Sequence, residues 1–397
     1  MSRDVNVKIS IVIAVYNMEK TVERAIRSVL NQTYENKELI VMDGGSTDGT
    51  VSIITKYAEK LKYWVSAPDQ GPSDAISKAL SHAEGTLIGF LGADDWYEPY
   101  ALELVAEASK NGDADLFYGN IAVHNGDEVQ VKDLSSFCPD RLYTDGTQWL
   151  GAVCAFTKKE LLAWNYTKEN NVLHTDYLYF LRLFAENKRF AHIGSDRVIT
   201  NFSIGGRTTR GDFCSRLNTH REVTKLRAQF KREYPEMRDL YSKHDEIAEK
   251  EFAIGMMPYY RRVLGVEDYR ANIMETDLTG DCCILFGAGN YGVQIAKEWK
   301  ISETVRIECF VDNDPKKWGQ YVEGIEVKSP ETLLNMEGKC VIVTPAPKYE
   351  TQIMEQLRRW GVDQKNQVVS YANIAVQIYN RLGIQVLEEA YHRGVVI

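Results

Sequence analysis

Carboxylate side chains directly follow two apolar runs near the start of the sequence. Val41-Met42 leads into Asp43-Gly44-Gly45, and Phe90-Leu91-Gly92-Ala93 leads into Asp94-Asp95. Two adjacent carboxylates beside a buried run repel each other unless a cation binds there. Such oxygen ligands suit Mg²⁺ or Mn²⁺, which commonly bridge carboxylates to substrate phosphates. An Asp followed by glycines can accept hydrogen bonds from a ribose or a base, because glycine lets a ligand approach the backbone closely.

Each of these residue groups also has a purely local interpretation. Ser46 or Asp48 could cap the helix that follows, and the Asp94-Asp95 pair could cap the next one. A third acidic segment, Asp69–Ala75, opens another predicted helix. The acids of this segment, Asp74 among them, could hold sugar hydroxyls and Lys78 could neutralise a phosphate, or these residues could be caps and solvated charges. Spacing alone leaves these alternatives open.

The elements that position these residues alternate between strand and helix. The apolar pattern of residues 7–110 predicts strands at Val7–Val15, Glu38–Met42, Tyr63–Ser66 and Thr86–Leu91, and helices at Glu19–Leu30, Thr50–Leu61 and Ser73–Ala83. This alternation builds a mostly parallel sheet with helices on both faces, and ligands bind at the carboxyl ends of its strands. Residues 113–210 are less regular and predict short strands with one helix around Asp176–Ala185.

The order of five sequence pieces resembles the nucleotide-binding half of inverting, GT-A-type glycosyltransferases of family 2. The pieces are Ser10–Asn17, Ser28–Tyr34, Asp43–Thr50, Asp69–Ala75 and Gly92–Asp95. A weaker likeness continues through Leu173–Leu183 and Asn201–Thr208. Many family members have an acid where Gly92 stands. The resemblance therefore implies a metal site with only two carboxylates in this chain and a less strict dependence on the metal.

The resemblance implies a function and a set of site residues. The chain would transfer a hexosyl or N-acetylhexosaminyl group from a nucleotide-sugar, a UDP-sugar by expectation, to an acceptor hydroxyl with inversion. Asp176 would be the general base, and Asp94 and Asp95 would hold Mn²⁺ or Mg²⁺. The expected donor-binding residues are Tyr16, Asn17, Asp43, Gly44, Asp74, Lys78, Asp94 and Asp95. The acceptor would be a glycan or a lipid-linked sugar of bacterial surface polysaccharide or glycolipid synthesis.

A second strand–helix pattern begins after Gly280. A buried-type strand precedes Gly287-Ala288-Gly289-Asn290-Tyr291-Gly292, and the next strand ends in Asp312. In this context the glycines and the acid form a dinucleotide-binding fingerprint. The unit resembles small Rossmann-like domains found with sugar-modifying enzymes, and it contains no Tyr-x-x-x-Lys pair for a short-chain dehydrogenase. It could bind NAD or a nucleotide through Gly287, Gly289, Gly292 and Asp312, or serve in structure or assembly.

These patterns predict an α/β protein with a GT-A (Rossmann-like, nucleotide-binding) N-terminal domain, a helical linker and a second, smaller Rossmann-like α/β domain. The expected boundaries are 1–212 for the glycosyltransferase domain, 213–278 for the linker, 279–372 for the Rossmann-like domain and 373–397 for a helical tail. The linker carries a basic stretch at residues 216–232. It could contact anionic lipid at the inner face of the membrane, or it could be a solvated helix that packs Leu226 and Phe230 between domains.

The composition of the chain limits the classes of protein to which it can belong. The chain has 397 residues, 44% hydrophobic and 26% charged, and a formal net charge of −9. The acidic balance argues against general nucleic-acid binding, and no apolar run approaches the ~18 residues of a membrane span. Seven cysteines without a CxxC pair fit a reducing cytoplasm. Three other functions remain open beside the glycosyltransferase hypothesis. The chain could be a non-catalytic nucleotide-sugar-binding scaffold, a bifunctional protein whose C-terminal domain binds NAD or a nucleotide, or an oxidoreductase centred on Gly287–Gly292. Each of these proteins could form a homo-oligomer.

Overall fold

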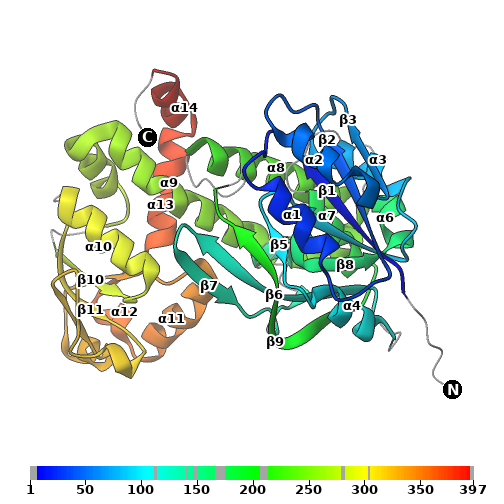
Figure 1. The fold of residues 1–397 in the computed structure, drawn as a ribbon. Coiled ribbons are helices and arrows are strands. Elements are labelled where there is room, and N and C mark those ends of the chain that lie inside the picture. Colours follow the sequence, from blue (N-terminus) through cyan, green and yellow to red (C-terminus); the bar gives the residue numbers. More distant parts are fainter. Residues whose placement is uncertain are drawn as a thin grey trace. The chain divides into compact units, whose positions relative to one another are not determined.

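A computed structural model describes residues 7–110, 114–139, 142–145, 151–165, 175–205, 213–278, 282–302 and 305–393. The chain divides into two compact units, Met1–Tyr241 and Ser242–Ile397. Each unit contains its own sheet (Figure 1). The expected α/β fold is confirmed, and the division into four segments drawn from the sequence stays a prediction.

The first unit is built on a sheet in which the described residues form nine strands. Its order is β3-β2-β1-β4-β8-β6-β9-β5, and β7 pairs with β6. Strands β1 to β4 are mutually parallel, whereas β8 is antiparallel to both β4 and β6. The strands are β1 Ile9–Val15, β2 Lys37–Asp43, β3 Tyr63–Ser66, β4 Leu87–Gly92, β5 Trp96–Tyr97, β6 Leu116–Asn125, β7 Glu128–Lys132, β8 Ala155–Lys158 and β9 Phe190–Ser203.

Strand register brings the predicted site segments to one edge of the sheet. Val15 at the end of β1 pairs with Asp43 of β2, and Asp43 in turn pairs with Ser66 of β3. On the other side of β1, Ala14 pairs with Gly92 at the end of β4. Because these strands are parallel, their following loops leave the sheet at the same edge, as the sequence predicted.

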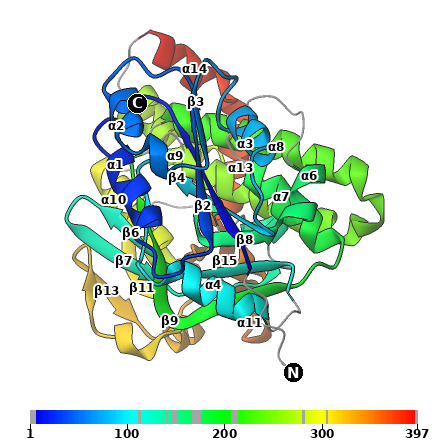
Figure 2. The ribbon, with the colours of Figure 1, turned by 45° about the vertical axis from the view of Figure 1, so that its right-hand side comes forward.

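Helices cover both faces of this sheet. Alternate residues of β1 point to opposite faces, so Ile11 and Ile13 pack in one hydrophobic cluster with α1 and α4, and Val12 packs in another with α3, α7 and α8. Figure 2 shows α1 and α2 on one side of β1 and β2, with α3, α6 and α7 on the other. The helices of this unit are α1 Val22–Leu30, α2 Thr50–Lys56, α3 Pro72–Leu80, α4 Ala101–Lys110, α5 Leu142–Asp145, α6 Lys159–Asn165, α7 Thr175–Ala185 and α8 Phe213–Glu233.

Two strands are longer than the sequence pattern indicated. β6 extends over ten residues and β9 over fourteen, and they pair in parallel along most of their length. β9 does not show a simple alternation, because its middle residues Ser195–Arg197 are exposed and the register shifts beside them. The expectation of short strands in this region therefore holds for β7 and β8 and is wrong for β6 and β9.

The basic helix α8 packs on the first unit. Its Leu226 and Phe230 belong to the same hydrophobic cluster as α7, and the Arg227 guanidinium donates to the Tyr143 carbonyl at 2.6 Å. Some of the basic side chains therefore serve packing, whereas Lys225 and Arg232 are exposed. A 3-10 turn at Pro235–Met237 leads to α9, Arg238–Met274. Gly265, with a φ of 76°, breaks α9 into two helical stretches.

The second unit has a sheet of order β12-β13-β11-β10-β14-β15 in the described residues. Five of these strands are parallel, and β12 is antiparallel to β13. The elements are β10 Cys282–Phe286, α10 Asn290–Ser302, β11 Arg306–Val311, β12 Tyr321–Val322, β13 Ile325–Lys328, β14 Cys340–Val343, α11 Pro347–Arg359, α12 Val362–Lys365, β15 Gln367–Ser370, α13 Tyr371–Leu382 and α14 Gln385–His392.

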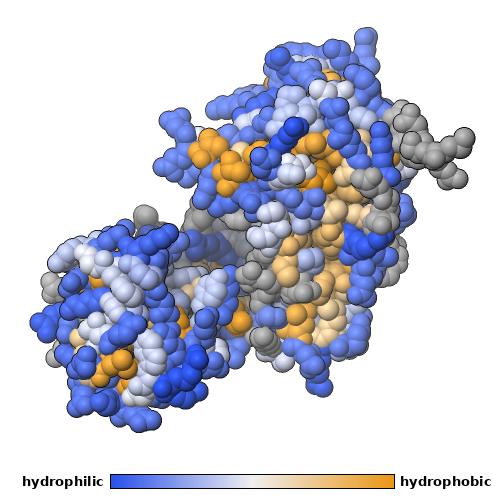
Figure 3. All heavy atoms as spheres, turned by 90° about the horizontal axis from the view of Figure 1, so that it is seen from below, coloured by the Kyte–Doolittle hydropathy of each residue, from blue (hydrophilic) through white to orange (hydrophobic). Residues whose placement is uncertain are grey.

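The surface is mainly hydrophilic, with hydrophobic side chains gathered in a few patches in the view of Figure 3. Among the most exposed large hydrophobic side chains are Tyr16, Val129, Val131 and Tyr321. None of the helices in the described part of the chain combines the length and apolar character needed to cross a bilayer.

Candidate functional site

The carboxylates of Asp94 and Asp95 converge where β4 ends. A Cβ atom built on Gly92 would lie 2.3 Å from Asp95 Oδ2 and 3.0 Å from Asp94 Oδ1. The space that a side chain at position 92 would fill is therefore taken up by the carboxylate of Asp95. Asp95 itself is only 2% exposed, and its Oδ1 accepts a hydrogen bond from the Ser203 amide at 2.8 Å.

The electrostatics of this pair favour a bound cation. Burial raises the pKa of Asp95 to about 8, and the neighbouring charge of Asp94 adds to the shift. Burial also raises the pKa of Asp94. Buried carboxylates that are difficult to ionise alone, with converging oxygens, fit a divalent cation whose other ligands come from phosphate and water. The described residues contain no cluster of three or more His, Cys, Asp or Glu side chains that would hold a metal by themselves.

Arg24 and Ser203 hold the backbone at these acids. The Arg24 guanidinium lies 3.7 Å from the centre of the Trp96 ring and donates to the Asp94 carbonyl at 2.6 Å. The Ser203 hydroxyl donates to the same carbonyl at 2.7 Å. His124 lies against the Trp96 ring at 4.6 Å between ring centres. The segment after β4 is therefore fixed by residues of α1, β6 and β9.

Asp43 organises the loop after β2. Its carboxylate accepts hydrogen bonds from the Gly45 and Ser46 amides and from the hydroxyls of Ser46 and Ser66. Asn17, which has a positive φ of 52°, accepts from the Thr47 amide through its side chain at 2.8 Å. These contacts join the loops after β1 and β2 into one surface. Tyr16 is 58% exposed beside it.

The segment opening α3 lies against the same surface. A Cβ on Gly44 would approach Asp69 Oδ2 to 3.0 Å, so a side chain at position 44 would require the Asp69 carboxylate to shift by a few tenths of an ångström. Asp69 belongs to the acidic segment recognised in the sequence but not to the expected donor-binding residues. Asp74 and Lys78, by contrast, pair with each other at 2.6 Å, and Asp74 also accepts from the Gln70 amide. That geometry agrees with the local interpretation of these two residues and leaves a role in donor contact as a prediction.

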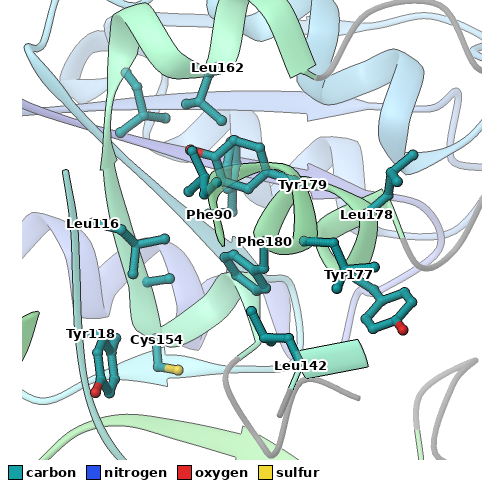
Figure 4. Close-up of a cluster of buried hydrophobic side chains, with 14 of the residues drawn as sticks. Phe90, Leu116, Tyr118, Leu142, Cys154, Leu162, Tyr177, Leu178, Tyr179 and Phe180 are labelled. Atoms are coloured by element: carbon teal, nitrogen blue, oxygen red, sulfur yellow. The ribbon is translucent and has the colours of Figure 1, made fainter. Parts of the chain in front are cut away.

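Asp176 lies in the first turn of α7 and borders a small apolar cavity. Phe90, Leu116, Ala155 and Phe180 line this cavity with it. Several of these apolar side chains belong to the hydrophobic cluster of Figure 4, which includes Tyr179 and Phe180 from α7, Leu116 and Tyr118 from β6, and Cys154. Asp176 Oδ1 accepts from the Tyr177 amide at 2.9 Å. Residues 173–174 and 206–208 of the two family-like segments lie outside the described residues.

Two buried side chains, Cys154 and Tyr97, respond to the charges of the site. Burial raises the pKa of the Cys154 thiol to about 12, and the nearby Asp176 carboxylate contributes. Burial likewise raises the pKa of Tyr97, with contributions from Cys154 and Asp95. The Cys154 thiol is therefore near Asp176, and the Tyr97 hydroxyl is near Asp95.

The glycine pattern of the second unit has three different physical causes. Gly287 has a φ of 113°, and a Cβ on Gly292 would lie 1.9 Å from the Gly287 carbonyl oxygen. Both positions are therefore required by the turn and by packing. A Cβ on Gly289 would meet nothing within 4 Å, which leaves open space at the start of α10. This division of roles is the one a pyrophosphate-binding turn requires.

Asp312 is already engaged by its own unit. Its carboxylate accepts from the Ala288 and Asp314 amides at 2.7 and 2.9 Å and pairs with Lys317 at 2.9 Å. Burial alone would raise the pKa of Asp312, but these hydrogen bonds outweigh burial and hold it below its ordinary value. In this arrangement Asp312 stabilises the glycine turn, and ribose binding by this residue stays a prediction.

Two family models match the sequence. Residues 10–168 match the model described as "Glycosyl transferase family 2", and residues 280–368 match "C2185-like, N-terminal". The first match covers the sheet edge at which Asp43, Asp94 and Asp95 lie. The second covers the glycine turn and most of the second sheet.

Curated relatives extend the first match. An "Uncharacterized glycosyltransferase" of Haemophilus influenzae is 30% identical over 198 residues, which are 48% of this chain and 78% of the relative. The Escherichia coli protein "UDP-Glc:alpha-D-GlcNAc-diphosphoundecaprenol beta-1,3-glucosyltransferase WfgD" is 32% identical over 125 residues. These are 31% of this chain and 49% of that relative, so the chain spans about half of its length.

A solved structure supports the fold. The S. aureus TarS fragment 1–349, crystallised in complex with UDP-GlcNAc, has a TM-score of 0.51 and 19% sequence identity, and the match covers 98% of this chain and 92% of that one. At this identity the likeness concerns the fold, which is the GT-A type. Together with the family model and the Haemophilus influenzae relative, it identifies the chain as a member of glycosyltransferase family 2.

Proposed function

We propose that the first unit transfers a sugar from a UDP-sugar to an acceptor hydroxyl with inversion at the anomeric carbon. The observation that carries this proposal is the convergence of Asp94 and Asp95 at the edge where the loops after β1 and β2 also meet. The Escherichia coli relative, whose name states a UDP-Glc donor, supports the choice of uridine. The transferred group would be a hexosyl or N-acetylhexosaminyl residue.

Binding of the nucleotide would use the surface formed by the first two loops. Tyr16 offers an exposed ring on which a base can stack. Asp43 and Asn17 hold the loop backbone in place, and Gly44 keeps the surface close to the ligand. Asp74 and Lys78 would reach the donor only by exchanging their mutual ion pair for contacts with it.

Asp94 and Asp95 would hold Mn²⁺ or Mg²⁺ with the donor diphosphate. The cation, when bound, offsets the negative charge that develops on the leaving nucleotide. Arg24 holds the Asp94 carbonyl, and the Ser203 amide orients the Asp95 carboxylate, so both acids are positioned before the donor arrives. Preorganised groups of this kind need no rearrangement during the reaction.

Asp176 would take the proton from the acceptor hydroxyl while that oxygen attacks the anomeric carbon. The apolar side chains around Asp176 exclude water from one side of it. Proton transfer by a positioned base typically contributes ~10²–10⁴ in rate. The acceptor itself would be a glycan or lipid-linked sugar.

An Asp176→Asn variant tests this role. The amide cannot accept the proton, so we expect UDP release from UDP-glucose or UDP-GlcNAc to slow by about 10²–10⁴. The dissociation constant for UDP, measured by calorimetry, should stay within about twofold because Asp176 is not part of the nucleotide surface. Asp127→Asn, at an exposed turn of the same unit, is the matched control. A normal rate in Asp176→Asn would remove this residue from the mechanism.

A second candidate activity is nucleotide or NAD binding by the second unit. The open space at Gly289 supports it, whereas the engagement of Asp312 by Ala288 and Lys317 counts against ribose recognition of the usual kind.

We further propose a cytoplasmic location, with peripheral contact to the membrane through residues 216–232 and self-association as additional features. Lys225 and Arg232 are exposed on α8 and available for anionic lipid.

A further inference from the structure

A groove runs beside α1, next to the expected donor site. Its volume is about 480 Å³, and its lining includes Lys20, Glu23, Arg24, Arg27, Asn31 and Tyr97. Lys20, Arg24, Arg27 and Asn31 are all exposed and follow one another at intervals of three or four residues. This spacing places them along one side of α1 and its flanks.

The groove carries a local surplus of positive charge. It is lined by three cations and one acid on a chain whose formal net charge is −9. The acid, Glu23, accepts a hydrogen bond from the Tyr57 hydroxyl at 2.7 Å. Across the described residues, neither the Lys20 ammonium nor the Arg27 guanidinium forms a hydrogen bond or an ion pair. Two cationic side chains are therefore available to an anionic ligand.

Arg24 makes the groove continuous with the Asp94–Asp95 site. Its guanidinium stacks on Trp96 and donates to the Asp94 carbonyl and to the Ser203 hydroxyl. A guanidinium fixed in this way loses little conformational entropy when it binds an anion, and its planar fork matches the oxygens of a phosphate. A ligand bound to Arg24 in the groove would therefore lie close to Asp94 and Asp95, the expected metal ligands.

We propose that this groove binds a phosphate or diphosphate group of the acceptor. The inference rests on the proposed sugar transfer and names one chemical class of acceptor. Several cations in a row suit a multiply charged phosphate better than a single carboxylate. The donor diphosphate is expected at the carboxyl ends of the strands, whereas this groove lies along α1, so the two phosphate sites are distinct.

The test measures binding of inorganic pyrophosphate by calorimetry in buffer containing EDTA. Without a divalent cation the Asp94 and Asp95 carboxylates do not attract an anion, so the signal reports the groove. The double variant Lys20→Gln/Arg27→Gln should bind pyrophosphate about tenfold more weakly, the effect of losing two partly exposed charge pairs. Lys56→Gln, an exposed lysine at the end of α2, should stay within about twofold of the wild type.

Further arms separate this inference from the proposed function and identify the source of the phosphate. The dissociation constant for UDP with Mn²⁺ should be unchanged in the double variant; a parallel loss would assign the groove to the donor and overturn the inference. Farnesyl diphosphate and glucose 1-phosphate are then used to displace pyrophosphate, as a lipid-linked and a soluble source. Displacement by either supports the inference. Displacement by neither, or equal pyrophosphate binding in all variants, overturns it while leaving UDP binding as the separate test of the transferase.

Discussion

At the scale of single residues, the absence of a side chain at position 92 has a physical cause. Asp95 is buried, and its Oδ2 lies where a Cβ on Gly92 would have to stand. Relocating that carboxylate would also break its hydrogen bond with the Ser203 amide. The glycine is therefore part of the carboxylate arrangement rather than a simple loss of a third acid.

Adding a side chain at this position should weaken the site. In Gly92→Ala and Gly92→Asp the new Cβ displaces the Asp95 carboxylate, so we expect the affinity for UDP with Mn²⁺ to fall at least about tenfold. Calorimetry measures the affinity, and circular dichroism checks that the fold is kept. Gly151→Ala is the control, because a Cβ there would meet no atom closer than 3.7 Å. Tighter Mn²⁺-dependent binding in Gly92→Asp would contradict this account.

The acids of the site could be predicted from the sequence, whereas their supporting residues could not. Asp43, Asp94 and Asp95 each end or follow a recognisable strand, so parallel pairing alone predicts that they share an edge. Arg24 and Ser203 reach the same place from positions 70 and 109 residues away from Asp94 in the chain. No local pattern marks such contacts, because they depend on the packing of α1 and of β9, a strand that comes much later in the sequence.

At the scale of elements, a buried carboxylate joins the ends of the central strands opposite the site. Glu38 on β2 accepts hydrogen bonds from the Ser10 hydroxyl of β1 and from the amide of Glu84, just before β4, and it pairs with Lys8 at 2.7 Å. Burial alone would raise the pKa of Glu38, but these partners hold it below its ordinary value. The charged form is therefore favoured by folding.

This linkage gives a pH dependence of stability. Because the pKa of Glu38 is lower in the folded state, its contribution is present above its ordinary value of 4.5 and is lost as the pH falls through the folded pKa. Glu38→Gln should lower the free energy of unfolding by about 1–3 kcal/mol at pH 7 and by much less at pH 3. Urea unfolding at both pH values measures this, with the exposed Glu107→Gln as control. An equal loss at both pH values would contradict the assignment.

Strand and helix prediction succeeded where the apolar pattern is local. The predicted strands around β1, β2 and β4 lie within a few residues of the observed ones. The prediction failed for β9, which pairs in parallel with β6 through a shifted register and exposes its middle residues. That strand is defined by a partner more than seventy residues earlier, so a window of neighbouring residues does not reveal it.

At the scale of the whole molecule, the chain combines two sheets with separate glycine requirements. In the first unit glycines make room for acidic side chains at the site, whereas in the second Gly292 makes room for the Gly287 carbonyl. The proposed transferase residues all belong to the first unit. We therefore expect the stability of the second unit and UDP binding to respond to different substitutions.

Gly292→Ala tests this separation. A Cβ 1.9 Å from a backbone oxygen forces the turn to shift, so we expect a loss of about 3 kcal/mol in the stability of the second unit. Hydrogen exchange of peptides from β10 and β14 measures that loss, while the dissociation constant for UDP should stay within about twofold. Gly289→Ala has open space for its methyl group and is the matched control. A loss of UDP binding in Gly292→Ala would contradict the separation.

The most direct test of the proposed function is thermal stability with UDP, GDP and NAD⁺, each with and without Mn²⁺, in the wild type and in Asp95→Asn. A ligand at 100 times its dissociation constant should stabilise the protein by ~2.7 kcal/mol. The shift is compared within each variant, because removing a buried carboxylate changes the starting stability. We predict a shift with UDP that requires Mn²⁺ and is lost in Asp95→Asn. A shift with NAD⁺ alone, or a UDP shift that persists in Asp95→Asn, would contradict the account.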